Sequence, residues 1–224
     1  MIYLSFVLLS LNVLVTFAAC IIATLYRHKK DLNLIRLYIY YSTVNIIISL
    51  IFSATRSRIL YYELFNLENL ISTCLIYFYF RRLMIRESLR KAVLVLYMVF
   101  AGLSVFLLFG PPDLFKTFIP PFYGTTNLFI TIPCFFYFYE IFRSDLETNY
   151  KKDPSFYVVS AIFLSYGVTM PFYFGYNTIF SLSKAGNEIL GDVNLFIWLC
   201  FYVILIVAFI LPSPDNYKIE KQSV

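Results

Sequence analysis

Seven long apolar stretches, separated by short polar segments, make up the hydrophobic pattern of the chain. Each stretch has about the 20 residues that an α-helix needs to cross the hydrocarbon core of a bilayer. The pattern predicts seven transmembrane helices, over residues 3–25, 33–55, 59–80, 92–110, 118–142, 156–180 and 193–211. We therefore predict an all-α polytopic membrane bundle that forms one domain, residues 1–224, with its longest connections at residues 143–155 and 181–192.

Composition supports this class of protein. Hydrophobic residues make up 60% of the chain and charged residues 14%, and the mean hydropathy is +0.75. Typical soluble chains have about 45–50% apolar and about 25% charged residues, so a soluble or disordered protein is excluded. The net charge of +5 comes from short basic runs between apolar stretches. We therefore expect a lipid bilayer, and no nucleic acid, as the partner of these residues.

The distribution of Lys and Arg predicts the orientation of the bundle. With the N-terminus outside, 14 of the 18 basic residues lie on the cytoplasmic side: Arg27, Lys29, Lys30, Arg36, Arg81, Arg82, Arg86, Arg90, Lys91, Arg143, Lys151, Lys152, Lys218 and Lys221. Only four lie on the other side: Arg56, Arg58, Lys116 and Lys184. Because basic residues concentrate in cytoplasmic loops, we predict a multi-pass protein of the cell (inner) membrane, with its N-terminus outside and its C-terminus cytoplasmic.

The third stretch, residues 59–80, is the most polar of the seven. It contains Glu63, Asn66, Glu68, Asn69 and Thr73. At 100° per residue, the two asparagines and the threonine share one stripe, with Glu63 at its edge, whereas Glu68 lies on another flank. A helix that is polar on two flanks is expected to sit centrally in the bundle.

Glu68 is the group whose burial costs most, because it lies near the predicted midplane, where a charged side chain costs about 2.5–3.5 kcal/mol on insertion scales. One interpretation is a structural hydrogen bond between helices. The other is a site for a small-molecule ligand, a proton or an ion. The candidate ligand-binding residues are Glu68, Asn66, Asn69, Thr73, Glu63 and Asn45.

Residue sets that membrane enzymes require are missing from the sequence. The single histidine, His28, lies in a predicted loop, and the four cysteines fall in four different spans. All the aspartates are expected in connections: Asp31, Asp113, Asp145, Asp153, Asp192 and Asp215. We therefore expect no catalytic residues, no metal site, no cofactor and no enzymatic activity.

The connection after the third span is the most basic of the chain. It holds Arg81, Arg82, Arg86, Arg90 and Lys91. These residues are typical topology determinants. They are also candidates for contacts with anionic lipid headgroups or with a cytoplasmic partner.

Two segments carry a resemblance to a known group of proteins. One joins Asn66 and Glu68 to the aromatic run 77–80 and to Arg81-Arg82; the other runs from Phe135–Glu140 to Asp153–Tyr157. Together they resemble small seven-helix bacterial membrane proteins that are often encoded beside, or fused to, sensor histidine kinases. The resemblance covers some 50 of the 224 residues. The chain departs from the group at Tyr157, where tryptophan is expected, and at Ala161, where glycine is expected.

The resemblance implies a sensory or signalling-accessory module with Asn66 and Glu68 as its polar feature. Because only 13 residues, 212–224, follow the last span, such a module would relay to a sensor kinase or another signalling protein. An alternative is a small solute or proton carrier that uses Glu68 as its mid-membrane carboxylate. A third is a scaffold subunit in which the polar residues serve assembly alone.

Overall fold

The computed structural model describes residues 2–55, 58–109, 120–143, 152–175 and 184–212. Within these ranges the chain is all-helical, with seven α-helices, one 3-10 turn and no strand. The elements are α1 (Ile2–Leu25), η1 (Lys30–Leu32), α2 (Asn33–Thr55), α3 (Arg58–Leu83), α4 (Glu87–Phe109), α5 (Pro120–Arg143), α6 (Pro154–Phe174) and α8 (Lys184–Ile210).

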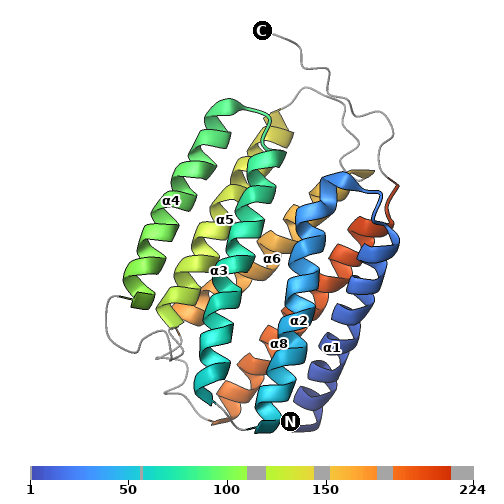
Figure 1. Cartoon of the computed structure of the whole chain (residues 1–224), viewed down its shortest axis with the longest axis vertical. Coiled ribbons are helices and arrows are strands. Elements are labelled where there is room, and N and C mark those ends of the chain that lie inside the picture. The colour runs from blue at the N-terminus through green and yellow to red at the C-terminus, as the bar shows by residue number, and fades with distance from the viewer. Residues whose placement is uncertain (1, 56–57, 110–119, 144–151, 176–183, 213–224) are drawn as a thin grey trace.

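The helices alternate in direction along the chain (Figure 1). Six of them form a ring in which each packs against the next, in the order α1, α2, α3, α5, α6 and α8, and α8 closes the ring against α1. The remaining helix, α4, lies outside the ring against α3 and α5. Side chains of the ring helices therefore meet in a shared interior.

The predicted ranges agree closely with the observed helices, with three differences. Helix α4 begins at Glu87, five residues before its predicted start, so Arg90 and Lys91 lie in the helix and not in the connection before it. Helix α6 ends at Phe174, and residues 176–180 of its predicted span lie outside the described residues. Helix α8 begins at Lys184, so the prediction of a connection over 181–192 is wrong from residue 184 onward. Asp192 therefore lies inside a helix, where it is buried and accepts a hydrogen bond of 2.5 Å from Ser5 of α1. The polar first part of α8 was not predicted as helix because a pattern of apolar residues cannot show that Asp192 is paired with Ser5 of α1.

Five helices are long and apolar enough to cross a membrane: α1, α2 with its preceding turn, α4, α6 and α8. Large apolar side chains are exposed along them, including Leu14, Val44, Phe106 and Val207. Exposed apolar surface on this scale is typical of a protein solvated by lipid. The chain is thus a membrane protein. Helices α3 and α5 fall short of the same criterion because of their polar residues.

The expected central position of the third helix is only partly correct. Helix α3 packs against three neighbours, α2, α4 and α5. However, Leu67 and Phe78 on its outer side are 42% and 48% exposed. The helix belongs to the wall of the ring and does not form its axis.

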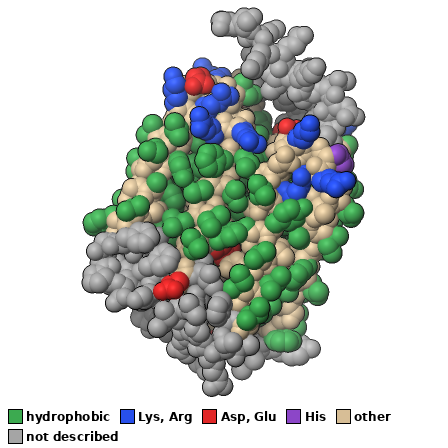
Figure 2. All heavy atoms as spheres, in the orientation of Figure 1, with side chains coloured by type: hydrophobic (Ala, Val, Ile, Leu, Met, Phe, Trp, Pro, Cys, Tyr) green, Lys and Arg blue, Asp and Glu red, His purple; other side chains and the backbone are tan. Residues whose placement is uncertain are grey.

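Lysine and arginine side chains gather at one end of the bundle, over the junction of α1 with α2 and the turn between α3 and α4 (Figure 2). Helices α1, α3 and α5 end there, and helices α2, α4 and α6 begin there. Every basic residue whose side chain the structure describes lies there: Arg27, Lys29, Lys30, Arg36, Arg81, Arg82, Arg86, Arg90, Lys91, Arg143 and Lys152.

Candidate functional site

One polar flank of α3 faces α5. The side-chain amide of Asn69 donates to Thr126 Oγ1 at 3.0 Å, and Tyr77 donates to the backbone carbonyl of Phe129 at 2.9 Å. Asn66 accepts a hydrogen bond from Tyr123. These hydrogen bonds join α3 to α5 and satisfy polar groups whose burial without a partner would cost free energy. Such bonds between membrane helices contribute about 0.6–2 kcal/mol each.

Thr73 belongs to the same flank but bonds within its own helix. Its hydroxyl donates to the carbonyl of Asn69 at 2.6 Å. Three of the candidate ligand-binding residues, Asn66, Asn69 and Thr73, are therefore engaged in the contact between α3 and α5 or in the backbone of α3. Glu63 is half-buried near the start of α3, and no described contact joins it to this flank or to Glu68.

The second polar flank of α3 faces α2 and carries Glu68. The Asn45 side chain of α2 donates to Glu68 Oε2, so the structure brings these two candidate residues together. Glu68 is half-buried. Figure 2 shows an acidic surface recessed among hydrophobic side chains in the middle of this face of the bundle. The remaining carboxylate oxygen has no hydrogen-bond donor among the described residues.

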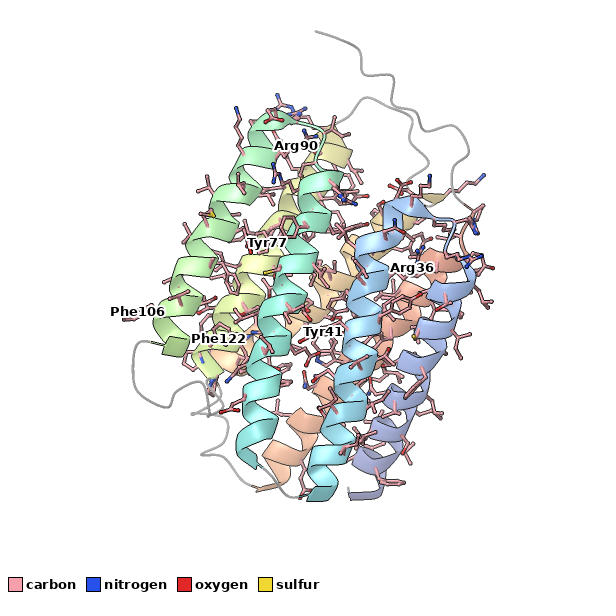
Figure 3. The ribbon with its side chains drawn as sticks, viewed as in Figure 1. Arg36, Tyr41, Tyr77, Arg90, Phe106 and Phe122 are labelled. Atoms are coloured by element: carbon pink, nitrogen blue, oxygen red, sulfur yellow. The ribbon has the colours of Figure 1, made fainter. Side chains whose placement is uncertain are left out.

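Three buried tyrosines, one from each of three helices, lie near this carboxylate. Tyr38 of α2, Tyr166 of α6 and Tyr202 of α8 all interact electrostatically with Glu68. The hydroxyls of Tyr38 and Tyr166 lie 3.4 Å apart. Tyr41, labelled in Figure 3 where α2 approaches α3, also interacts with Glu68. We call Glu68, Asn45 and these four tyrosines the Glu68 site.

Aromatic side chains hold the tyrosines of the Glu68 site in place. The ring of Phe201 packs edge-on against Tyr38, with centroids 5.8 Å apart, and Trp198 packs edge-on against Tyr166 at 5.5 Å. Edge-to-face contacts at this distance are favourable because a ring edge is positive and its face is negative. The hydroxyls are thus presented to the interior of the ring by a tightly packed aromatic wall.

Two buried serine hydroxyls lie next to the Glu68 site. Ser72 of α3 is 5% exposed, and its hydroxyl has no hydrogen-bond partner. Ser42 of α2 is 2% exposed and makes no hydrogen bond of good geometry, although its hydroxyl lies beside that of Tyr202 on α8. Ser72 lies one helical turn after Glu68, and Ser42 lies one turn before Asn45, so both belong to the same faces as that pair. A buried polar group without a partner costs about 1–3 kcal/mol, so the Ser72 hydroxyl requires an explanation.

The basic end of the bundle is organised by a carboxylate that the sequence patterns did not single out. Glu140 of α5 is buried and accepts hydrogen bonds from the backbone N–H groups of Ile85 at 3.0 Å and Arg86 at 2.7 Å. Both lie in the turn that leads into α4, where free N–H groups and the helix dipole favour a negative charge. The signal in the sequence is a glutamate at the end of an aromatic run, near the predicted cytoplasmic end of its span.

The predicted lipid- or partner-contact residues lie on and after this turn. Arg81, Arg82, Arg86 and Lys91 are exposed, whereas Arg90 is half-buried and pairs with Glu87 at 3.2 Å. The Arg86 guanidinium also lies 5.7 Å from the ring of Tyr139, and that of Arg143 lies 5.6 Å from it. The turn thus presents an exposed cationic surface, and Glu140 and Tyr139 of α5 hold it in place.

Two further basic residues donate hydrogen bonds to backbone carbonyls at helix ends near this surface. Arg36 donates to the carbonyls of Tyr26 and Lys29, both at 3.2 Å, where α1 ends. Lys29 is buried and donates to the carbonyl of Leu211 after α8. Burial lowers the pKa of Lys29. Both side chains satisfy carbonyls that a helix end leaves free.

Comparisons with known protein families, with curated proteins and with solved structures give no match. Among the described residues, no group of three or more His, Cys, Asp or Glu could hold a metal ion. The chemistry available at the Glu68 site is therefore that of one carboxylate, one amide and several hydroxyls.

Proposed function

We propose that the chain is a sensory or signalling-accessory protein of the inner membrane, with seven transmembrane helices, an outside N-terminus and a cytoplasmic C-terminus. Helices α3 and α5 have 26 and 24 residues, which correspond to about 39 and 36 Å. Both are long enough to cross, and polar side chains of the two helices pair with one another, Asn69 with Thr126 and Asn66 with Tyr123. Gathering of the basic side chains at one end supports the cytoplasmic assignment of that end.

One observation carries this proposal: a single uninterrupted helix, α3, bears both Glu68 and the start of the basic turn. Arg81 follows Glu68 by 13 residues, or roughly 20 Å along the helix. A change in how Glu68 packs against α2 would shift or rotate α3 as a unit. Glu140 ties the turn after α3 to α5. A shift of α3 would therefore move Arg81 and Arg82 relative to the rest of the turn and so change the shape of the cationic surface that a partner contacts.

The proposed partner is a cytoplasmic signalling protein, such as a sensor kinase. Support comes from the exposed basic residues of the turn and from the resemblance described above. Among the described residues, Arg81, Arg82 and Lys91 have no acidic partner within the chain. They are available to acidic side chains of another protein or to anionic headgroups.

The test is site-specific photo-crosslinking in native membranes. A photoreactive amino acid replaces Arg82 or Lys91 on the turn, and the matched control replaces Phe106, an exposed apolar residue of α4. We expect the two turn positions to give the same adduct with a cytoplasmic signalling protein and the control to give none. Adducts with lipid alone at both turn positions would contradict the signalling role.

A second candidate function is transport of a proton or small solute. It is favoured by the hydroxyls of Tyr38 and Tyr166, which lie 3.4 Å apart within the Glu68 site and connect α2 to α6 across the interior of the ring. Flux into proteoliposomes tests this function with Glu68→Gln, which removes the ionisable group and keeps its size. Flux that depends on the protein but not on this substitution would reject the carrier mechanism.

A further inference from the structure

Neutral oxygen donors surround a single acid at the Glu68 site. The carboxylate of Glu68 has one oxygen bound by Asn45, and no described side chain donates to the other. The buried hydroxyls of Ser42 and Ser72 lie one turn away on the same two helix faces. Ser72 has no partner, and Ser42 makes no hydrogen bond of good geometry but lies beside Tyr202. Two helices thus bring one negative charge and, one turn from it, two hydroxyl oxygens to the same region of the bundle.

We propose that a small monovalent cation, such as Na⁺ or K⁺, binds between α2 and α3 in this region. The carboxylate of Glu68 supplies its negative charge. The hydroxyls of Ser42 and Ser72 and the side-chain oxygen of Asn45 supply neutral ligands. Carboxylate, carbonyl and hydroxyl oxygens are the ligands that hard cations prefer.

Charge balance selects a monovalent ion. A single carboxylate neutralises one positive charge, and among the described residues no group of three or more His, Cys, Asp or Glu could hold a metal ion. A divalent ion would leave a net positive charge inside the membrane, where an unbalanced charge is costly. Conversely, an ionised Glu68 without a cation would itself be unbalanced.

The hydroxyls beyond these ligands fit the same occupant. Tyr38, Tyr41, Tyr166 and Tyr202 interact electrostatically with Glu68, and none of them carries a positive charge that would compete with a cation.

The first test is thermal unfolding of the purified protein in a nonionic detergent, which supplies no amine headgroup. The melting temperature is measured in NaCl, KCl and choline chloride at equal ionic strength. A ligand that binds only the folded state at 100 times its Kd raises the melting temperature of a protein of this size by about 5–11 °C. We expect a rise of this order in NaCl or KCl relative to choline chloride.

Variants assign the effect to the site. Glu68→Gln removes the charge and is expected to abolish the difference between salts. The double variant Ser42→Ala with Ser72→Ala keeps the charge and is expected to raise the cation concentration needed for half of the effect by at least about tenfold. Ser104→Ala is the matched control, because Ser104 is buried in α4 and bonds only to the carbonyl of Phe100.

A direct measurement keeps the inference testable if Glu68→Gln does not fold. Radioactive Na⁺ is bound to the wild-type protein and displaced by unlabelled NaCl, KCl or choline chloride. Saturable binding that choline does not displace, and that the double serine variant weakens, supports the site. Equal melting temperatures in all three salts, or a cation effect that persists in Glu68→Gln, would overturn it. The inference rests on the geometry of the Glu68 site alone, so it can fail while the proposed signalling role stands, and the reverse.

Discussion

Glu140 offers the sharpest test of how the basic turn is held. Its buried carboxylate accepts two backbone hydrogen bonds, from Ile85 at 3.0 Å and from Arg86 at 2.7 Å. Glu140→Gln keeps one acceptor oxygen but removes the charge and leaves one N–H facing an amide donor. Hydrogen bonds to charged groups contribute about 1.5–3 kcal/mol, and an unsatisfied buried donor costs about 1–3 kcal/mol.

We therefore expect Glu140→Gln to lower the free energy of unfolding by about 2–4 kcal/mol. For a chain of this length that corresponds to a fall in melting temperature of roughly 5–15 °C. The matched control is Glu87→Gln in the same turn region, because the Glu87 side chain is 61% exposed and forms only a surface pair with Arg90. Its loss should cost about 1 kcal/mol or less. Thermal unfolding in one detergent compares the two variants, and equal shifts would refute the reasoning about buried backbone capping.

Three other substitutions test the packing and the caps. Gly124→Ala should destabilise the protein by about 1–3 kcal/mol in thermal unfolding, because the added Cβ would lie 3.0–3.1 Å from the Phe174 ring, whereas Gly102→Ala, with nothing within 4 Å, should be neutral or stabilising. Asp153→Ala should cost about 1–3 kcal/mol, since Asp153 caps α6 through Ser155 and accepts from Tyr137; Asp153→Asn, which keeps the cap, should cost less, and equal losses would contradict the capping role. Lys29→Met should release the end of α8 and speed hydrogen exchange of the amides near Leu211, and unchanged exchange there would show that the lysine does not hold this end.

The sequence predicted the helices well because crossing a bilayer requires about 20 apolar residues in succession, and that requirement is visible without knowing any neighbour. It also predicted correctly that the polar residues of α3 lie on two flanks. Asn66, Asn69 and Tyr77 contact α5, whereas Glu68 contacts α2. A period of 3.6 residues is sufficient for that separation.

Features that depend on which helices become neighbours were not predicted. Tyr166 and Tyr202 come near Glu68 only because α6 and α8 close the ring between α5 and α1, which no local pattern shows. Asp192 was placed in a connection because its helix begins with polar residues, although its partner is Ser5 on another helix. Glu140 was missed because its partners are backbone N–H groups, which are not visible as a residue pattern.

The central claim of this account is that α3 crosses the bilayer and carries Glu68 to its middle. A nitroxide spin label at Leu67→Cys, in a background without the four native cysteines, reports depth directly, because Leu67 is exposed next to Glu68. In bilayers, we expect this label to collide mainly with dissolved oxygen, and a label at Arg82→Cys to collide mainly with a water-soluble nickel complex. A Leu67 label as accessible to nickel as the Arg82 label would contradict the claim.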